Sequence, residues 1–515
     1  MCPGSASVPA IKGVTALQPA LAGLVDSAKL THAGLAESEP PELDDEPLYA
    51  ARKKIYPQHV SGTYRRVKWA VLFLTLGIYY LLPFVRWDRG PNAPGQAVLL
   101  DLPARRFYFF FIEIWPQEVY YLTGLLIVAA MVLFLMNAVA GRVWCGYLCP
   151  QTVWTDLFQT IERWIEGDRR EHLQRDRQGW SLDRVIRAGA KHFLWLMVAW
   201  WTGGVWVLYF ADAPHLVYSL ATFQAPPVAY AFIGLLTFTT YALAGWMREQ
   251  VCVYMCPWPR IQAALTDEYA LNVTYRCDRG EPHASLKKAA AMHEAGQPAG
   301  DCIDCLQCVH VCPTGVDIRN GPNLGCIQCG LCIDACDAVM AKIGRATRLI
   351  AYDTDINIKR RQQGQPAVYN IVRVRTLLYA GVIALVGGVM LYALATRHHD
   401  DISVLHDRNP LYVRLSDGAV RNGYAIRILN KTLEERSYAL AVSGLPGAEV
   451  DVIGSESSFG GNPEVYVGPD QSREMRVLIT THRHLEPEAS IPLTFSIVPV
   501  QGGTAVNAAD HFLGP

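Results

Sequence analysis

The chain has 515 residues, of which 51% are hydrophobic and 18% are charged, and its 46 basic and 47 acidic residues leave a net charge of −1. This composition is too apolar for an ordinary soluble enzyme and too polar for a protein made only of spanning helices. The balanced charge provides no basic field, so nucleic acid is excluded as a partner. We therefore expect a mixed membrane and soluble protein of about three or four domains.

The amino-terminal segment is rich in Ala, Gly, Pro and acidic side chains and has no sustained apolar period. Such a composition predicts a disordered segment over residues 1–50. It contains no basic stretch followed by an apolar core and a cleavage site, so no signal peptide is expected.

Five later stretches have the roughly 20 apolar residues that a bilayer-spanning helix needs. They cover residues 67–85, 119–140, 192–210, 228–247 and 376–396. The segment 107–112 is also apolar, but Arg105 and Arg106 lie so close that we expect it to be interfacial or half-inserted. The prediction is a membrane domain over 51–250 with four spans, and a fifth span over 376–396.

Basic residues beside the spans predict the orientation, because loops rich in Lys and Arg remain on the cytoplasmic side. The loop 142–191 is rich in arginine, whereas 211–227 contains no Lys or Arg. The first external loop departs from this trend, since it carries Arg86 and Arg89. The sum of the flanks places the N-terminus and residues 251–375 in the cytoplasm, and the chain after residue 396 outside.

The cysteine distribution indicates metal ligation in residues 251–375. Eight of the 14 cysteines fall between Cys302 and Cys336, in two runs of equal spacing, and the last 179 residues contain none. A disulfide scaffold would spread its cysteines through a small chain. The first run, C-x2-C-x2-C-x3-C-P, is the pattern of bacterial ferredoxins, and the second run has Asp337 in place of the proline. We expect a two-cluster ferredoxin-like domain with its motifs over 302–340.

In such domains the fourth cysteine of each run ligates the cluster of the other run. This crossed pattern assigns Cys302, Cys305, Cys308 and Cys336 to one 4Fe-4S cluster, and Cys326, Cys329, Cys332 and Cys312 to the other. A pair of zinc ribbons is the alternative, but zinc ribbons use two separated pairs of cysteines rather than two runs of four.

Four further cysteines form two C-x3-C-P pairs at the inner ends of the second and fourth predicted spans: Cys145 with Cys149, and Cys252 with Cys256. The spacing predicts that both sulfurs of a pair lie on one helical face, and that the following proline ends or kinks the helix. Four sulfur ligands would suit Cu(I), zinc or another cluster. The alternatives are buried structural cysteines or a redox-active dithiol pair.

Two carboxylates, Glu113 and Glu118, flank Trp115-Pro116-Gln117 at the outer end of the second span. A carboxylate at membrane depth often marks a proton or ion path. Pro116 is expected to start the helix, however, which places Glu118 in the first turn, where the helix dipole favours an acid. We favour this capping role.

From about residue 400 the sequence changes to short alternating runs separated by Gly, Asn, Asp and Pro. The runs cover residues 411–415, 424–429, 439–442, 465–467, 476–479 and 493–498. Six or seven strands at this spacing predict a β-sandwich of immunoglobulin type over 400–515. It contains no cluster of catalytic residue types, so we expect a docking role.

Taken together, these motifs resemble the FixG/CcoG family of membrane iron–sulfur proteins. The resemblance covers nearly the whole chain after residue 50, and it includes residues 52–57, 115–117, both C-x3-C-P pairs, residues 279–282, the ferredoxin runs and residues 407–417. It implies a cupric reductase that converts Cu(II) to Cu(I) in the assembly of the cbb-type cytochrome c oxidase. The residues expected to bind and reduce copper are Cys145, Cys149, Cys252 and Cys256.

The resemblance also implies a multi-pass protein of the bacterial inner membrane, with the iron–sulfur domain in the cytoplasm and the immunoglobulin-like domain in the periplasm. Its expected partners are the membrane, the cbb-type oxidase or its copper-delivery factors, and an electron donor that the sequence does not identify. Two alternatives stay open. One is a quinol-oxidising membrane polyferredoxin, which shares the paired cysteine motifs, and the other is a non-catalytic assembly scaffold.

Overall fold

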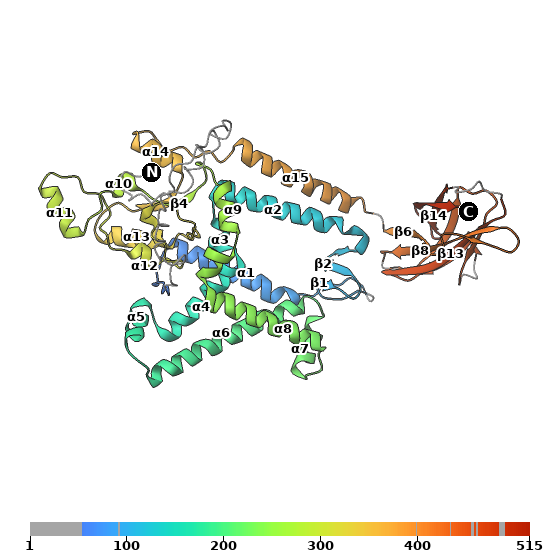
Figure 1. Cartoon of the computed structure of the whole chain (residues 1–515), viewed down its shortest axis with the longest axis horizontal. Coiled ribbons are helices and arrows are strands. Elements are labelled where there is room, and N and C mark those ends of the chain that lie inside the picture. Colours follow the sequence, from blue (N-terminus) through green and yellow to red (C-terminus); the bar gives the residue numbers. More distant parts are fainter. Residues whose placement is uncertain are drawn as a thin grey trace, which may run out of the picture. The chain divides into compact units, whose positions relative to one another are not determined.

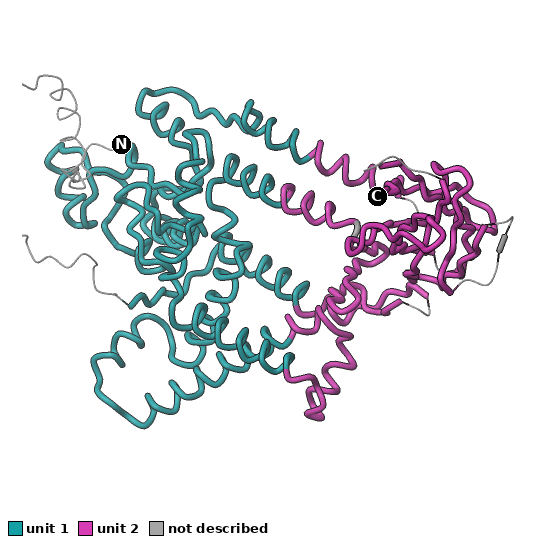
Figure 2. The backbone as a smooth tube through the Cα atoms, turned by 45° about the vertical axis from the view of Figure 1, so that its right-hand side comes forward, with its two compact units in different colours: residues 1–79, 129–204, 228–383 teal, residues 80–128, 205–227, 384–515 magenta. Residues whose placement is uncertain are grey.

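The computed structural model describes residues 54–514 except 91, 92, 398, 433, 455–457, 460, 461 and 484–489, so the segment 1–50 that we predict to be disordered lies outside them. The chain separates into two compact units, shown in teal and magenta in Figure 2. Unit 1 comprises residues 1–79, 129–204 and 228–383, and unit 2 comprises residues 80–128, 205–227 and 384–515.

Four helical segments in the described part of the chain are long and apolar enough to cross a membrane. They are α1 with the short helix η1 (Thr63–Phe84), α2 (Tyr120–Ala140), α8 with the π-helix η3 (Pro227–Met247), and α15 (Val374–Ala395). Within these segments α1 is Thr63–Leu81, η1 is Leu82–Phe84, α8 is Pro227–Thr240 and η3 is Tyr241–Met247. Four of the five predicted spans therefore coincide with such a helix, as the labels in Figure 1 allow the reader to follow.

The remaining predicted span, residues 192–210, lies in the 27-residue helix α6 (Leu182–Leu208), which does not reach the same apolarity. Lys191 and His192 stand at the start of its apolar part, and four tryptophans follow. Polar and amphipathic side chains of this kind lower the mean hydropathy of the segment without breaking the helix.

Shorter helices lie between the long apolar helices along the chain. They are α3 (Val143–Tyr147), α4 (Pro150–Glu166), α5 (Arg169–Arg177), the π-helix η4 (Val251–Met255) and α9 (Trp258–Leu265). Helix α4 is amphipathic, and its buried Phe158 packs with Trp195 and Ala199 of α6 and with Ala244 of η3. This packing holds α4, α6 and η3 together, because one apolar stripe of α4 recurs at helical spacing.

The cysteine-rich part of unit 1 is built on a small two-stranded sheet, β4 (Asn272–Tyr275) and β5 (Ile350–Asp353), which pair antiparallel. The chain between them forms short helices: α10 (Cys277–Gly280), α11 (Leu286–Glu294), α12 (Gln307–His310), η5 (Ile318–Asn320) and α13 (Leu331–Lys342). Helix α14 (Asp355–Gln362) follows β5. A core that includes Val273, Ile333 and Met340 packs the sheet against α13.

Unit 2 begins with a three-stranded antiparallel sheet of β1 (Val98–Asp101), β2 (Arg106–Phe109) and β3 (Ile112–Ile114). The apolar segment 107–112 therefore lies in strands, and Tyr108 is buried while the following Phe109 is exposed. This alternation is the strand period of two. The short helices η2 (Pro116–Glu118) and α7 (Ala213–Ala221) also belong to this unit.

The carboxyl-terminal part of unit 2 has the predicted immunoglobulin-like sandwich architecture, with two antiparallel sheets (Figure 1). One sheet has the order β10-β13-β8-β6 with β7 beside β8, and the other has the order β11-β12-β9-β14-β15. The strands are β6 (Asp400–His406), β7 (Val413–Arg414), β8 (Val420–Asn430), β9 (Arg436–Ser443), β10 (Glu449–Val452), β11 (Ser458–Phe459), β12 (Asn462–Val467), β13 (Gln471–Thr481), β14 (Ser490–Pro499) and β15 (Val506–Leu513). Each of the six predicted runs lies in or overlaps one of these strands.

The sandwich is held by side chains that alternate into a common core. Tyr424, Ile426 and Ile428 of β8 are fully buried, as are Tyr438 of β9 and Phe495 of β14. Because successive residues of a strand point to opposite faces, this spacing builds the core from alternate residues of both sheets.

Candidate metal centres

The two ferredoxin runs have the same local backbone. In the first run Asp304 and Leu306 have positive φ angles, and in the second run Gln328 and Gly330 do. These residues stand at equivalent positions on either side of the second cysteine. Leu306 and Gly330 are the N-caps of α12 and α13, so each run turns sharply and then enters a helix.

Two features of Gly330 favour a residue without a side chain. Its φ angle is +74°, which disfavours a side chain, and an added β-carbon would lie 2.8 Å from the ring of Tyr64. The helix that follows carries Cys332 and Cys336, and both are set by this turn. The sequence shows the glycine but not the ring that occupies the space beside it.

The fourth cysteine of each run lies beside cysteines of the other run: Cys336 packs in one core with Cys302 and Cys308, and Cys312 lines one pocket with Cys326 and Cys329. Burial raises the pKa of the Cys336 thiol to about 12, and the neighbouring thiols that add to this effect are Cys308, Cys305 and Cys302. Burial likewise raises the pKa of Cys326 to about 12, with further contributions from Cys329 and Cys312. Cys336 thus lies with the first run, and Cys312 with the second.

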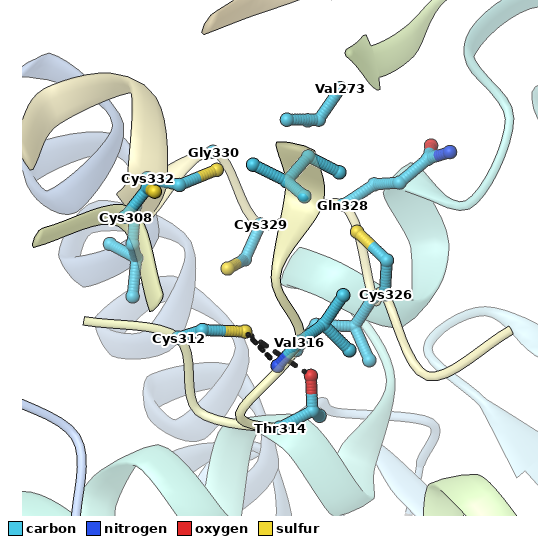
Figure 3. Close-up of a pocket in the computed structure, with 13 residues that line it drawn as sticks. Val273, Cys308, Cys312, Thr314, Val316, Cys326, Gln328, Cys329, Gly330 and Cys332 are labelled. Carbon is cyan, nitrogen blue, oxygen red and sulfur yellow. Dashed lines mark hydrogen bonds between the residues drawn. The ribbon is translucent and has the colours of Figure 1, made fainter. Parts of the chain in front are cut away.

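The thiols of the second group surround a pocket. Cys312, Cys326, Cys329 and Cys332 line it, together with Cys308 of the neighbouring group, as Figure 3 shows. The backbone N–H of Val316 donates to the sulfur of Cys312 at 3.4 Å. A 4Fe-4S cluster is ligated by thiolates, and these thiolates accept hydrogen bonds from backbone N–H groups. The ring of cysteine sulfurs and the N–H of Val316 fit such a cluster.

The C-x3-C-P pairs differ from expectation, because the two cysteines of a pair do not share one helical face. Cys145 lies in α3 and Cys252 in η4, but Cys149 is the N-cap of α4 and Cys256 is the C-cap of η4. Their ψ angles are 125° and 122°, which is extended backbone. The cause is the following proline, which excludes the helical conformation from the residue before it.

The fold nevertheless brings the two pairs together. Burial raises the pKa of the Cys145 thiol to about 12, and Cys149 and Cys252 add to this effect. Burial, and then Cys149 and Cys256, likewise raise the pKa of the Cys252 thiol to about 12. The four sulfurs form one group of thiols, which we call the membrane thiol group.

The membrane thiol group is open rather than closed around a single ion. Among the described residues, the one set of three ligand atoms that lie within 4.8 Å of one another is Glu162, Glu166 and His172. A tetrahedral zinc site with Zn–S bonds of about 2.3 Å would require sulfurs closer than this limit. The arrangement therefore does not match a closed zinc site, whereas two thiolates are enough to hold Cu(I).

The sequence analysis missed a group of buried charges beside Cys252. Cys252 lines a pocket with Lys68, Asp156, Arg248 and Glu249. Each of these charged residues is less than a tenth exposed. In the sequence they stand in separate segments among other charged residues, which usually indicate a solvated surface, so no local signal revealed them.

The carboxylates Glu162 and Glu166 already have cationic partners. Arg248 lies 2.6 Å from Glu162, and Lys191 lies 2.9 Å from Glu166. These cations compensate the negative charge that a metal ion would otherwise neutralise. We interpret the set around His172 as an ion-pair network.

At the other predicted position of interest, Glu118 has the capping role that we favour. Its carboxylate accepts a hydrogen bond from the backbone N–H of Trp115 at 3.2 Å. It also accepts from Lys431 at 2.9 Å, with both side chains almost fully buried. Glu118 is therefore committed to the start of the helix and to one cation of the sandwich.

Three models of protein families match the chain. Residues 247–355 match a 4Fe-4S dicluster domain, residues 122–168 match a 4Fe-4S binding domain, and residues 390–515 match the IG-like fold at the C-terminus of FixG. The first two contain all twelve cysteines described above. Two 4Fe-4S binding domains and an immunoglobulin-like domain are thus present.

Similar proteins cover most of the chain. The nitrogen fixation protein FixG of Rhizobium meliloti is 50% identical over 461 residues, which are 84% of this chain and 87% of that protein. The protein RdxA of Cereibacter sphaeroides is 47% identical over 90% of this chain and 99% of its own length. Among solved structures, the FixG-related protein from Vibrio parahaemolyticus aligns with 22% of this chain at 19% identity, with a TM-score of 0.19.

Proposed function

The chain belongs to the FixG family, and from this premise we propose that this iron–sulfur electron-transfer protein is a cupric reductase that acts in the assembly of the cbb-type cytochrome c oxidase. The observation that carries the proposal is the membrane thiol group, whose Cys145 packs with Cys329 and Ile327 of the second ferredoxin run and whose Cys252 lines a pocket with Ile327 and Pro313. Soft thiolates favour Cu(I) over Cu(II), so they favour the reduced product.

The eight ferredoxin cysteines would hold the two clusters, by the crossed assignment of Cys302, Cys305, Cys308 and Cys336 to one and Cys326, Cys329, Cys332 and Cys312 to the other. The two clusters supply one-electron transfer when they are bound. The membrane thiols bind the substrate: Cu(II) at two of them gains one electron, becomes Cu(I) and is released to an acceptor. Cys145 and Cys149, with Cys252 and Cys256, would carry this step.

We also propose that all five predicted segments span the bilayer. Support for the span in α6 comes from Phe193, Leu196 and Trp200, which are 62%, 44% and 58% exposed. They recur at helical spacing and so form one apolar face, which lipid would cover. Five spans with the basic loops inside place the ferredoxin-like part in the cytoplasm and the sandwich in the periplasm, where it would dock the oxidase or a copper-delivery factor.

The test is an anaerobic reduction experiment. The purified protein is reduced chemically, excess reductant is removed, Cu(II) is added, and cluster oxidation is followed by absorbance while the Cu(II) paramagnetic signal is followed by EPR. We expect both to change at matching stoichiometry. The variants Cys145→Ser and Cys252→Ser should lower the rate at least tenfold with unchanged iron content.

The matched control is Met255→Leu, which removes a sulfur beside Cys256 without touching a thiol. It should reduce Cu(II) at the rate of the unchanged protein. Clusters that stay reduced while Cu(II) persists would instead favour the quinol-oxidising or scaffold alternatives. Rapid cluster reduction by a quinol in the absence of copper would separate these two.

A further inference from the structure

The second ferredoxin run packs directly against the first C-x3-C-P pair. A β-carbon on Gly146 would lie 2.8 Å from the carbonyl oxygen of Ile327 and 3.1 Å from the Cα atom of Cys329. The neighbouring Tyr147 donates its hydroxyl to the carbonyl oxygen of Cys329 at 2.9 Å. Cys145 belongs to the same buried core as Cys329 and Ile327. Helix α3 therefore brings a membrane thiol to within one layer of side chains of a predicted cluster ligand.

The second C-x3-C-P pair reaches the same part of the ferredoxin domain. Cys252 lines a pocket with Ile327 of the second run and with Pro313 and Thr314, which follow Cys312. Cys312 is the crossed ligand predicted to belong with the second run. Both halves of the membrane thiol group thus adjoin the site of Cys326, Cys329, Cys332 and Cys312, which we call the inner cluster site.

Arg142, which lies just before the first C-x3-C-P pair, contacts both the second ferredoxin run and the segment after the second C-x3-C-P pair. Its guanidinium donates to the carbonyl oxygens of Leu324 at 2.6 Å and Cys326 at 3.3 Å, and to that of Pro259 at 3.0 Å. Its own backbone N–H donates to the Gln328 side chain at 2.7 Å. Leu324 and Gln328 flank Cys326, and Pro259 follows the second C-x3-C-P pair. Arg142 itself precedes Cys145 by three residues.

The position of Arg142 also makes it an electrostatic neighbour of both thiol sets. Arg142 is 7% exposed. Burial lowers the pKa of its guanidinium, and the thiols that oppose this effect are Cys326 of the inner cluster site and Cys145 of the membrane thiol group. Arginine side chains remain protonated in folded proteins, so Arg142 carries a positive charge beside both sets of thiols.

The first ferredoxin run has an arginine clamp of its own. Arg345 donates to the carbonyl oxygens of Gly300 at 3.1 Å and Asp301 at 2.7 Å, just before Cys302. Neither carbonyl belongs to a C-x3-C-P element. Each run is therefore held by an arginine that donates to its backbone carbonyls. Among the described residues, Arg142 also donates to Pro259 beside the second C-x3-C-P pair, whereas the contacts of Arg345 stay next to the first run.

We propose that Arg142 is a positioning residue that holds the inner cluster site against the membrane thiol group, which makes that site the point from which electrons leave the ferredoxin-like part. Cys326, Cys329, Cys332 and Cys312 would hold the 4Fe-4S cluster that supplies the electron: one electron would pass to one acceptor at the membrane thiols, so that the cluster would be oxidised and the acceptor reduced, with no proton or group transferred. The identity of the acceptor as Cu(II) rests on the proposed function, but the role of Arg142 does not.

Two physical consequences follow from this placement. A fixed positive charge beside a cluster stabilises its reduced state, which carries one more negative charge, so Arg142 raises the reduction potential of the inner site. The planar guanidinium also fixes three carbonyls at once, which a lysine ammonium on a flexible stem cannot reproduce. Charge and geometry can therefore be separated by substitution.

The experiment uses the full-length protein in nanodiscs, with a potentiometric titration of both clusters followed by EPR. Arg142→Gln should lower the potential of one cluster, so that its reduced-to-oxidised ratio at the original midpoint falls about tenfold, which is about 59 mV for one electron. Arg345→Gln, the matched control, should shift the other cluster and leave the first unchanged. Iron and sulfide contents are measured for each variant.

If the Arg142→Gln variant loses a cluster, the proposal is tested with Arg142→Lys instead. It keeps the positive charge, so we expect an almost unchanged potential, but a rate of cluster oxidation by added Cu(II) that falls at least tenfold. The inference is wrong if Arg142→Lys matches the original protein in rate, or if Arg142→Gln and Arg345→Gln shift the same cluster.

The two proposals fail in different ways. If the unchanged protein does not reduce Cu(II), the cupric reductase proposal is wrong, while the selective potential shift in Arg142→Gln still supports the placement of the inner site. The rate in Arg142→Lys is then measured with a small ferric chelate as the acceptor. If Cu(II) is reduced but neither Arg142 variant changes a potential or a rate, the cupric reductase stands and the role of Arg142 falls.

Discussion

A single carboxylate, Asp156 of α4, holds two buried cations of α1. Its oxygen lies 2.8 Å from Arg65 and 3.8 Å from Lys68, and all three side chains are 5% exposed. Burial opposes ionisation of Asp156, but Lys68 and then Arg65 hold its pKa below the usual range. Because the charges are desolvated, each depends on its partner far more than a surface ion pair would.

Asp156→Asn should therefore destabilise the protein strongly. It leaves Arg65 and Lys68 buried beside a neutral amide, which costs about 3–5 kcal/mol when a buried pair is broken in this way. The measurement is the free energy of unfolding in a mild detergent, followed by circular dichroism.

The control is Asp183→Asn, which breaks the exposed pair with Arg187, where the two side chains are 64% and 43% exposed. An exposed pair four residues apart contributes only about 0.3–0.5 kcal/mol. Equal effects of the two substitutions would show that the charges around Asp156 are not desolvated in solution.

Among the elements, the short helix α3 packs closely against the second ferredoxin run. It has five residues and ends at Tyr147, two residues before Cys149, and Pro150 then starts α4. A helix this short has little stability of its own and depends on packing. Gly146 permits that packing, since its missing side chain lets the backbone of the second run approach closely.

Gly146→Ala should separate α3 from the second run. The new methyl group would lie 2.8 Å from a carbonyl oxygen, so one backbone must shift. We expect the inner cluster to become more accessible and its oxidation by a membrane-impermeant ferric chelate to speed up at least threefold. EPR-detected oxidation rates of the two clusters provide the measurement.

Gly189→Ala is the matched control, because Gly189 of α6 has no atom within 4 Å of an added β-carbon. In a helix interior this change stabilises by up to about 1 kcal/mol. Both clusters should then oxidise at the original rates, and a change as large as that in Gly146→Ala would contradict the packing explanation.

On the scale of the whole molecule, unit 2 joins segments that are distant in the chain. Arg106 of β2 lies 2.8 Å from Asp470, which precedes β13 of the sandwich, and Lys431 lies 2.9 Å from Glu118. Arg106 also lies 3.1 Å from Glu113. The first of these pairs connects the three-stranded sheet with the sandwich, the second connects η2 with the sandwich, and the contact between Arg106 and Glu113 lies within the three-stranded sheet.

The anchoring of the sandwich should weaken as pH rises. Burial, and then the carboxylate of Asp470, raise the pKa of Glu113 from 4.5 to about 8. The stability that protonated Glu113 contributes is complete below about pH 4.5 and is lost progressively as pH rises to about 8, with a slope of at most about 1.4 kcal/mol per pH unit. Calorimetry of the full chain in nanodiscs from pH 5 to pH 9 measures this loss.

In Glu113→Gln this part of the pH dependence should disappear. Glu474→Gln is the comparison, because Glu474 forms an exposed pair with Arg427 on the same sandwich. Its pH profile should match that of the unchanged protein. If Glu113→Gln retains the full slope, the proton is not held at this carboxylate.

Much of the fold was predictable, because it depends on residues that are near in sequence. The six strands were predicted from the alternation of residues within each run, and four of the five apolar segments from their length of about 20 residues. The predicted role of Glu118 as a cap also followed from its distance to Pro116. The prediction that the two cysteines of each C-x3-C-P pair share one helical face was wrong. Cys149 and Cys256 have extended backbone, because each precedes a proline.

The sequence by itself determined the cofactor class, because the spacing of the two ferredoxin runs is a local property that cluster ligation imposes on the chain. It also determined that four more cysteines occur as two equal pairs. By the crossed pattern it also predicted that Cys336 belongs with the first run. Only the tertiary structure decided that the two pairs meet and that Arg142 joins them to the inner cluster site. These contacts link residues that are far apart in the chain, and they are made largely by backbone carbonyls, which every residue carries and no sequence pattern distinguishes.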